Sequence, residues 1–490
     1  MRKEIDLQNR LFTQPISAIQ FDLKSRDEIP KLLIGLRHIY NTPEIRGEVL
    51  KILSEIIPEN ICTKTGRRGM VLWQILVLGI LRLNCNWDYD KVQEIANEHR
   101  KVRQMMGHEE TDFQKRYSLQ TIKDNVSLLT PDILNRINTV AVLHGQALMG
   151  NKSKELRAGC DSFVVETDVH FPTDISLLFD AIRKVIMIMA KVCGILGITE
   201  WRQHDHNLKK IKKLFSTARK LKPSTSKDKK KKEQRQEVIR QAYETYTDLV
   251  DSFIQRAEEC IKTIRALHLD EVSGHLPVAE NFISHAKRQI DQIRRRVMEG
   301  EKIPHDEKVF SIFEEHTEWI CKGKAGVRQE LGPGVCIIKD QFGFILHHRV
   351  MEKETDDKIA VSIILETKKK FKNLAGCSFD RGFYTPEIKR KLKEEPDRVV
   401  LPKKGKLSEK EKEEEYSAEF SESRRKHSAV ESSVNALEKH ALDRCPDHGI
   451  HGFKRYVSLA VLARNIQIVG HIIQQRELKR QKQRELRLAA

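Results

Sequence analysis

Apolar residues recur at intervals of three and four through most of the first 150 residues, which is the period of an amphipathic helix. Segment 42–57 begins with Thr42 and Pro43, a pair suited to the first positions of a helix. Residues 70–83 are almost continuously apolar and predict a buried helix. Short helices separated by turns follow. This texture is typical of a helix-turn-helix domain that recognises DNA, and a plain helical bundle has the same pattern.

The hydrophobic pattern changes at residues 154–167, where a β-branched run predicts a strand. Residues 172–308 return to helical spacing. Two Val- and Ile-rich segments, 335–339 and 344–350, are joined by a short turn and predict a β-hairpin. A helix is expected to follow the hairpin over residues 356–371.

Two more strands and a late helix complete the pattern. A short buried strand ends at Asp380, a second strand covers residues 398–401, and the late helix contains residues 429–442. Residues 406–426 are rich in Lys and Glu and predict a mobile segment. If the helical stretch 172–308 is an insertion, three strands are followed by alternating helices and strands, which indicates an α/β fold.

The charge balance of the chain indicates a polyanionic partner. Its 88 Lys and Arg residues against 70 Asp and Glu leave a formal net charge of +18. The basic residues are densest over 208–236, a stretch that is either a solvated linker or a phosphate-binding surface. Because no apolar run reaches the roughly 18–20 residues that span a bilayer, we expect a cytoplasmic protein with no membrane partner.

Three acidic residues lie where an acid is costly unless it is paired or bound to a metal. Asp161 lies on the first strand beside an apolar run, Asp380 ends a later strand, and Glu431 lies between apolar residues of the late helix. Each alone is compatible with a capping or salt-bridge role. The carboxyl ends of strands in an α/β layer meet at one edge, and a helix packed across that edge can add a third carboxylate.

Three converging carboxylates repel one another unless divalent cations neutralise them. Their hard oxygen atoms suit Mg²⁺, with Mn²⁺ as a possible substitute, and the nine scattered cysteines offer no competing zinc-type spacing. Two such ions can activate a nucleophile and stabilise the leaving oxygen during attack on a phosphodiester. The sequence therefore predicts metal-dependent chemistry on a nucleic acid.

Four segments resemble blocks of bacterial insertion-sequence transposases of the DDE type, notably the ISNCY-like group: 161–178, 311–326, 378–387 and 427–470. The resemblance extends from about residue 40 to 475, and its motifs occur in the family's order. It implies an RNase H-like catalytic core with a helical insertion between its first two strands. It also implies two-metal DNA cleavage and strand transfer at terminal inverted repeats.

The resemblance assigns the catalytic and metal-binding triad to Asp161, Asp380 and Glu431. Asp168 and Asp174 lie close to the first of these positions in the sequence. Asp161 is preferred because it opens a segment of the form D, small or polar residue, x, V-V-E, whereas Asp168 occupies a position that resembles Asn in relatives. The 219 residues that separate Asp161 from Asp380 are consistent with a helical insertion between the first two strands.

Basic residues near the triad are candidates for contact with the DNA backbone. Arg424 and His427 precede Glu431 by seven and four residues, so His427 shares its helix face and Arg424 lies close to that face. Many relatives have Tyr and Arg before the glutamate and Lys after it, and this chain departs from that signature. Three lysines in the loop after the last strand are further candidates for contact with the DNA backbone: Lys403, Lys404 and Lys406. The alternative is that each is an ordinary solvated surface lysine.

The expected organisation has five parts: an all-helical DNA-end-binding domain (1–150), the first part of the RNase H-like core (151–173), a basic helical insertion (174–308), the rest of the core (309–475) and a basic C-terminal tail (476–490). The resemblance implies double-stranded DNA with terminal inverted repeats and target DNA as partners. It also implies a homodimer that cuts two ends together, located at the bacterial nucleoid. Two alternatives are a metal-dependent nuclease on the same core and a catalytically idle DNA-binding relic.

Overall fold

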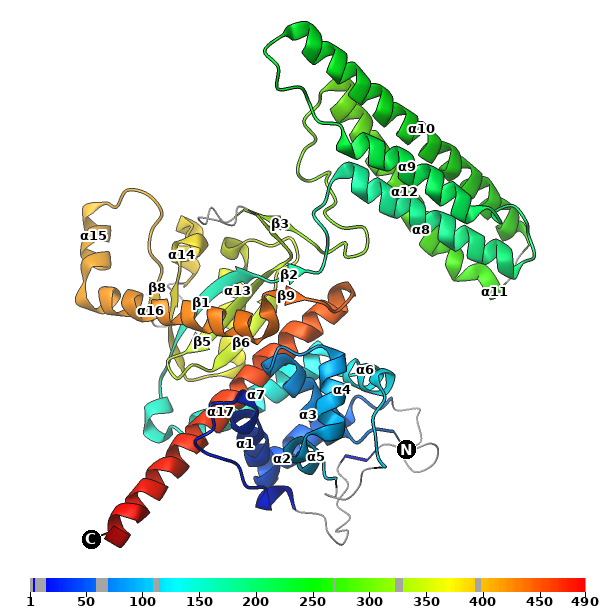
Figure 1. Cartoon of the computed structure of the whole chain (residues 1–490). Helices are drawn as coiled ribbons and strands as arrows, with labels where there is room; N and C mark the ends of the chain where they lie inside the picture. Colours follow the sequence, from blue (N-terminus) through cyan, green and yellow to red (C-terminus); the bar gives the residue numbers. More distant parts are fainter. Residues whose placement is uncertain are drawn as a thin grey trace. The chain divides into compact units, whose positions relative to one another are not determined.

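The computed structural model describes residues 3–4, 15–58, 69–108, 114–267, 270–321, 329–392 and 398–489. The chain divides into two units, which are described separately here (Figure 1). The first, the sheet unit, consists of Met1–Asp168 together with Glu318–Ala490. The second, the helical unit, consists of Val169–Thr317.

The sheet unit begins with helices: α1 (Glu28–Asn41), α2 (Pro43–Ser54), α3 (Leu72–Asn84), α4 (Tyr89–Glu98), α5 (Arg100–Met105), α6 (Leu119–Val126) and α7 (Pro131–Ala147). Every residue of α3 is buried, which confirms the buried helix predicted from its continuous apolar sequence. Pro43 and Pro131 occupy the first turns of α2 and α7, where the missing N–H of proline costs no intrahelical hydrogen bond. These helices share one core with residues from the C-terminal half of the chain.

The central sheet of this unit is mixed. Its five strands are β1 (Leu156–Val164), β5 (Gly334–Asp340), β6 (Ile345–Val350), β7 (Leu374–Phe379) and β8 (Arg398–Val400), in the spatial order β6-β5-β1-β7-β8. β1 pairs antiparallel with β5, and β5 with β6, whereas β7 and β8 run parallel to β1. The chain is therefore mixed α/β, as the sequence predicts at this level.

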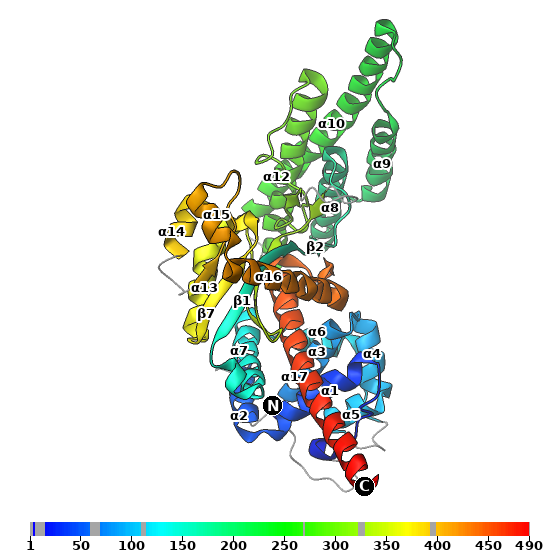
Figure 2. The same ribbon diagram turned by 90° about the vertical axis from the view of Figure 1, so that its left-hand side faces the viewer.

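Two further pairs of short strands lie outside the central sheet: β2 (Glu166–Thr167) with β9 (Arg444–Cys445), and β3 (Trp319–Ile320) with β4 (Glu330–Leu331). The helices that follow the hairpin are α13 (Asp356–Lys370), α14 (Pro386–Leu392), α15 (Glu409–Tyr416), α16 (Ala418–Leu437) and α17 (Gly449–Ala489). Alternate residues of the strands point to opposite faces, so the sheet contributes to two clusters of buried side chains. One includes α13, and the other includes α16 and the N-terminal helices (Figure 2).

Residues 409–416 and 418–426 are helical, where the sequence analysis predicts a mobile segment over 406–426. Ser408 and Glu411 form a capping box at the start of α15, and the hydroxyl of Ser417 accepts a hydrogen bond from the backbone N–H of Phe420 at the start of α16. Glu and Lys are also good helix formers, so charge alone does not prevent helix formation here. The helix that carries Glu431 is consequently longer than the sequence analysis predicts.

The helical unit contains α8 (Asp174–Ile195), α9 (His204–Lys220), α10 (Lys229–Ala266), α11 (Asp270–Ser273) and α12 (His275–Arg294). Its apolar residues form a core of their own, to which α8, α9, α10 and α12 all contribute. Most of the basic stretch 208–236 belongs to α9 and the start of α10. It is therefore mainly helix and not an extended linker.

One helix in the part of the chain that the structure describes, α17, is long and apolar enough to cross a membrane by length and composition. The sequence analysis expects no segment to meet that criterion. The apolar window of α17 is 72% buried in the structure. Leu459, Leu462 and Ile466 are fully buried in the core that α17 shares with the N-terminal helices. Its apolar character therefore corresponds to a central position within the sheet unit.

The crossing of α1 and α17 depends on two glycines. A Cβ atom added to Gly35 of α1 would collide with the backbone carbonyl of Ile466, and one added to Gly470 of α17 would collide with that of Lys31. The two backbones therefore approach more closely than any side chain at these positions would allow. By contrast, a Cβ atom at the exposed Gly47 of α2 would meet no atom within 4 Å.

We expect Gly35→Ala and Gly470→Ala each to lower the free energy of unfolding by about 1–3 kcal/mol or more, because the added methyl group must push two backbones apart. Gly47→Ala is the matched control and should raise it by about 0.5–1 kcal/mol through helix propensity. Denaturant titration of the three full-length variants measures the difference. Equal stability of the three variants would show that the close crossing is not required.

Candidate active site

Asp161 and Asp380 lie at the same level on neighbouring strands. In the parallel pairing of β1 with β7, Cys160 is the partner of Phe379, and each aspartate is the next residue along its chain. Asp380 keeps an extended backbone, with φ −76° and ψ 163°. Directly opposed residues on adjacent strands point to the same face and are separated by roughly 5 Å. The register therefore brings the first two predicted carboxylates side by side.

The helix α16 packs on the same face of the sheet as these two aspartates. Gly159, two residues before Asp161, has no room for a side chain because a Cβ atom there would collide with the side chain of Val430. The hydroxyl of Ser378, two residues before Asp380, lies 3.0 Å from Nδ1 of His427 in a hydrogen bond. Residues two apart in a strand share a face. Val430 and His427 thus anchor α16 directly beside the two aspartates.

Glu431 follows His427 by one helical turn. The pKa of His427 depends on the charges of both Asp380 and Glu431. Burial lowers the pKa of His427, and the negative charges of Asp380 and Glu431 oppose this shift. The imidazole is therefore close enough to both carboxylates to sense their charge. Asp380 and Glu431 are exposed and Asp161 is half-buried, so the site opens to solvent.

Short local hydrogen bonds orient the two aspartates. Oδ1 of Asp161 accepts from the backbone N–H of Ser162 at 2.8 Å. Oδ2 of Asp380 accepts from that of Gly382 at 3.4 Å, within the single 3-10 turn η4 (Arg381–Phe383). Each carboxylate keeps further lone pairs for other partners.

The donor set suits a hard divalent cation, because all three predicted ligands are carboxylates. In the described ranges, however, no three or more His, Cys, Asp or Glu side chains are already gathered into a group that could hold a metal ion. The structure therefore aligns two carboxylates by strand register and brings Glu431 to the same side by helix packing. It does not show a complete coordination sphere.

Asp168 and Asp174, the alternatives for the first position, are engaged elsewhere. Asp168 follows β2, which pairs with β9 outside the central sheet, and its carboxylate lies 3.6 Å from the guanidinium of Arg444. Asp174 is the first residue of α8 in the helical unit and forms an ion pair with Arg296 at 2.7 Å. Of the three, the structure places Asp161 beside Asp380.

The basic residues predicted to contact DNA have different surroundings. Lys403 forms an ion pair with Glu411 at 2.7 Å, and this carboxylate raises the pKa of Lys403. Lys404 donates a hydrogen bond of 2.9 Å to the backbone carbonyl of Gly382, so it holds the turn that follows Asp380. Lys406 and Arg424 are exposed. Lys404 therefore contacts the turn that follows Asp380, whereas the ammonium group of Lys403 already has a carboxylate partner.

Two residues near the site were missed by the sequence analysis. At Gly382, an added Cβ atom would lie 3.1 Å from Oδ2 of Asp356 and 3.8 Å from Oδ2 of Asp380. Asp356, the first residue of α13, therefore lies against the turn after Asp380. Nζ of Lys339 on β5 donates a hydrogen bond of 2.6 Å to the carbonyl of Ala429 in α16, and burial lowers the pKa of this lysine. The paired acids at 356 and 357, just before an apolar helix, were the available signal for Asp356.

A cavity of about 730 Å³ adjoins the site on the α16 face of the sheet. Its lining includes the backbone of Gly159 and Gly376, the side chains of Arg157 and Arg398, and Phe420 of α16. The cavity therefore lies beside the strand residues that precede Asp161 and Asp380, and none of the three predicted acids lines it.

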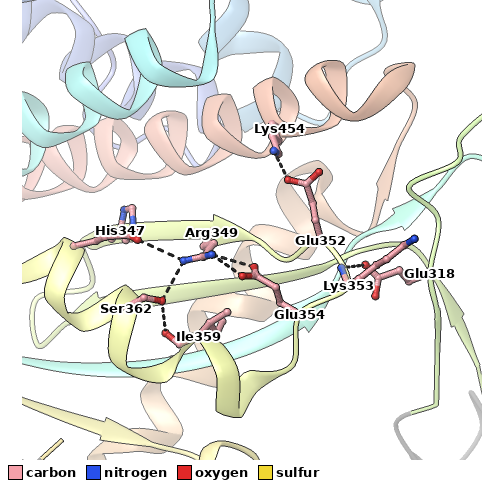
Figure 3. A network of polar contacts seen from close by, with 10 residues as sticks. Glu318, His347, Arg349, Glu352, Lys353, Glu354, Ile359, Ser362 and Lys454 are labelled. Carbon is pink, nitrogen blue, oxygen red and sulfur yellow. Dashed lines mark hydrogen bonds and ion pairs between the residues drawn. The ribbon is translucent and has the colours of Figure 1, made fainter. Parts of the chain in front are cut away.

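A second cluster of charged residues, between β6 and α13, is paired internally (Figure 3). Arg349 binds both carboxylate oxygens of Glu354, at 2.6 and 3.1 Å, and also reaches Ser362. Lys454 of α17 forms an ion pair with Glu352, and Glu318 accepts a hydrogen bond from the backbone of Lys353. Because these groups satisfy one another, the cluster fastens the end of β6 to α13 and is a weaker candidate for catalysis.

Comparison of the chain with protein-family models, curated proteins and solved structures gives no match. The resemblance to DDE transposases therefore depends on the sequence motifs alone.

The influence of Asp380 on His427 can be measured directly. We expect Asp380→Asn to lower the pKa of His427 further, because the substitution removes a negative charge that favours the imidazolium. Asp168→Asn is the matched control and should leave this pKa unchanged. NMR titration of the histidine ring signals, assigned with a His427→Gln variant, measures the shift. An unchanged pKa in Asp380→Asn would mean that the two groups are not neighbours in solution.

Proposed function

We propose that the protein is a DNA transposase of the DDE type, with Asp161, Asp380 and Glu431 as its catalytic carboxylates. The observation that carries the proposal is the register of β1 with β7, which aligns Asp161 with Asp380 beneath the helix that bears Glu431. Individually these acids have ordinary structural interpretations. Their arrangement on one face, where the ladder between the parallel strands β1 and β7 ends, is better explained by a shared chemical role.

The order of elements also supports an RNase H-like core. Along the chain, β1 is followed by a helical unit, the hairpin β5–β6, α13, β7, β8 and finally α16. This is the sequence of elements that the resemblance implies: strand, insertion, hairpin, helix, strand, strand and late helix. The mixed sheet, in which β7 and β8 run parallel to β1, is consistent with it.

In this proposal Asp161, Asp380 and Glu431 would hold Mg²⁺ or Mn²⁺, which activates the attacking oxygen and stabilises the leaving oxygen of a phosphodiester. The protein's own groups position the substrate. Lys404 keeps the turn after Asp380 in place, and the exposed Lys406 and Arg424 are available to phosphate oxygens. Burial favours the neutral form of His427, which supports Ser378 by a hydrogen bond and adds no cation to the acidic site.

The substrate would be double-stranded DNA carrying the terminal inverted repeats of an insertion sequence. Hydrolysis frees 3'-hydroxyl groups at the two ends, and the same site joins them to target DNA. Because two ends are processed together, we propose that the active species is a homodimer. The helices before β1, which include the short α4, α5 and α6, would recognise the ends.

Asp380→Asn should lower Mg²⁺-dependent cleavage of DNA by more than about a hundredfold, because losing a direct metal ligand costs more than losing the residue that supports one. The substrate is a linear DNA that includes both flanks of the coding sequence, and gel analysis of end-labelled DNA gives the rate. Asp168→Asn, which also removes one carboxylate, should cleave like the wild type. Equal cleavage by wild type and Asp380→Asn would refute the assignment.

The same assay separates the alternatives. A transposase joins a pre-cut end to a plasmid, whereas a nuclease on the same core cleaves without joining. Binding of the DNA with no turnover in either Mg²⁺ or Mn²⁺ would favour a catalytically idle DNA-binding protein.

A further inference from the structure

The helical unit carries an unusual concentration of positive charge on α9, the following loop and the start of α10. We define residues 209–240 as the lysine-rich segment. It contains fourteen Lys and Arg residues and three Asp and Glu residues, a net charge of +11 out of the +18 of the whole chain. All eleven of its lysines are exposed. Most of the protein's basic surplus therefore resides in 32 residues.

Among the residues that the structure describes, no lysine of this segment forms an ion pair with a carboxylate, whereas several other cations of the same unit do. Elsewhere in the helical unit, basic side chains are paired with acids at 2.6–3.3 Å: Arg256 with Glu200, Arg265 with Glu280, Lys287 with Glu258, Arg294 with Asp248, Arg295 with Glu301 and Glu307, and Arg296 with Asp174. The acids of the helical unit therefore neutralise cations outside the lysine-rich segment, and the segment keeps its positive charge.

The lysines also contribute nothing to the apolar core. The first buried residue of α10 is Ile239, so its first ten residues, about 15 Å of helix, lie outside the packed bundle. On α9 the buried positions are Ile211, Phe215 and Ala218, and the lysines occupy the other faces. α9 and α10 lie side by side, and the loop that joins them carries further lysines between the two helices (Figures 1 and 2).

The start of α10 is electrostatically unfavourable by itself. Lys229, Lys230, Lys231 and Lys232 occupy the first turn, where the helix dipole is positive, and the first turn contains no acid. Like charges three and four residues apart on a helix also repel. The one local compensation is Asp228, which accepts a hydrogen bond from the backbone N–H of Lys230. An external polyanion would relieve both the repulsion and the unfavourable dipole.

We infer that the lysine-rich segment is a binding surface for the phosphate backbone of duplex DNA. The inference rests on the proposed function in taking DNA as the polyanion, and it assigns a role to the helical unit. The surface is Lys-rich and almost without aromatic residues, so it makes contacts to phosphates without reading bases. Its role is to hold DNA independently of sequence while the sheet unit carries out the chemistry.

The test uses two full-length variants that each replace four lysines by Gln, a residue of similar helix propensity. One carries Lys229→Gln, Lys230→Gln, Lys231→Gln and Lys232→Gln. The matched control carries the same net charge, with four exposed, scattered lysines replaced by Gln: Lys51, Lys302, Lys479 and Lys482. Circular dichroism melts verify that both variants fold.

Binding to a short DNA duplex of arbitrary sequence is measured by fluorescence anisotropy in EDTA, between about 50 and 200 mM salt. Each lost phosphate contact lowers the slope of log K against log salt by about 0.9, so the α10 variant should lose about 2–4 from that slope and about tenfold or more in affinity at low salt. The control should retain the wild-type slope. Equal slopes and affinities for the α10 variant and the control would overturn the inference.

Two further probes distinguish DNA from other polyanions. If the α10 substitutions weaken binding to duplex RNA or to phosphatidylserine-containing vesicles but not to DNA, the inference is wrong. Because EDTA removes divalent cations, the binding result does not depend on catalysis. A wild type that binds DNA through the segment but never cleaves it would leave this inference in place and overturn the proposed function. If the wild type cleaves DNA and the α10 variant binds DNA as the control does, the proposed function stands and this inference is overturned.

Discussion

The sheet unit depends on the burial of α17. This helix contacts α1, α3 and α7 from the N-terminal half and β6 from the sheet, so a single element forms the interior of both. Its close approach to α1 needs Gly35 and Gly470. Just before α17, the carboxylate of Asp447 forms ion pairs with Arg82 of α3 at 2.7 Å and with Arg455 of α17 at 3.2 Å. This carboxylate is nearly inaccessible to solvent. A buried charge left without its partner is costly, so these three groups specify how α3 and α17 meet.

The same helix also holds the β5–β6 hairpin of the central sheet. Asn465 of α17 accepts a hydrogen bond from the backbone N–H of Ile345 and donates one to its carbonyl, at 2.9 and 2.8 Å, which ties β6 to the helix. Asp340 closes the β5–β6 hairpin by accepting from two backbone N–H groups and from Gln146 of α7. Burial raises the pKa of Asp340 to about 6. Because β5 pairs with β1 and β1 pairs with β7, the position of this hairpin also determines where Asp161 and Asp380 lie.

The sequence predicts the parts of this site that local pattern controls. Alternation of side chains and apolar flanks identify the strands that end near Asp161 and Asp380, and helical spacing relates His427 to Glu431. Contacts distant in sequence leave no such pattern. The position of Asp356 against the Asp380 turn and the role of α17 as a shared core depend on chain segments that meet only after folding. Lys403 and Glu411 are eight residues apart, and their pairing was missed because the sequence analysis does not predict α15. α15 and the part of α16 before residue 429 were missed because their caps compete with a composition typical of mobile segments.

The net charge of the protein conceals two opposite local environments. Asp161 and Asp380 lie on the face of the sheet that α16 covers, and burial favours the neutral form of His427, which senses the charges of Asp380 and Glu431. In the helical unit, the lysine-rich segment leaves its cations exposed while neighbouring arginines are neutralised by acids. Under the proposed function, the lysine-rich segment would bind DNA and the carboxylates of the sheet unit would hold the metal ions, so binding and chemistry would belong to different units of one chain.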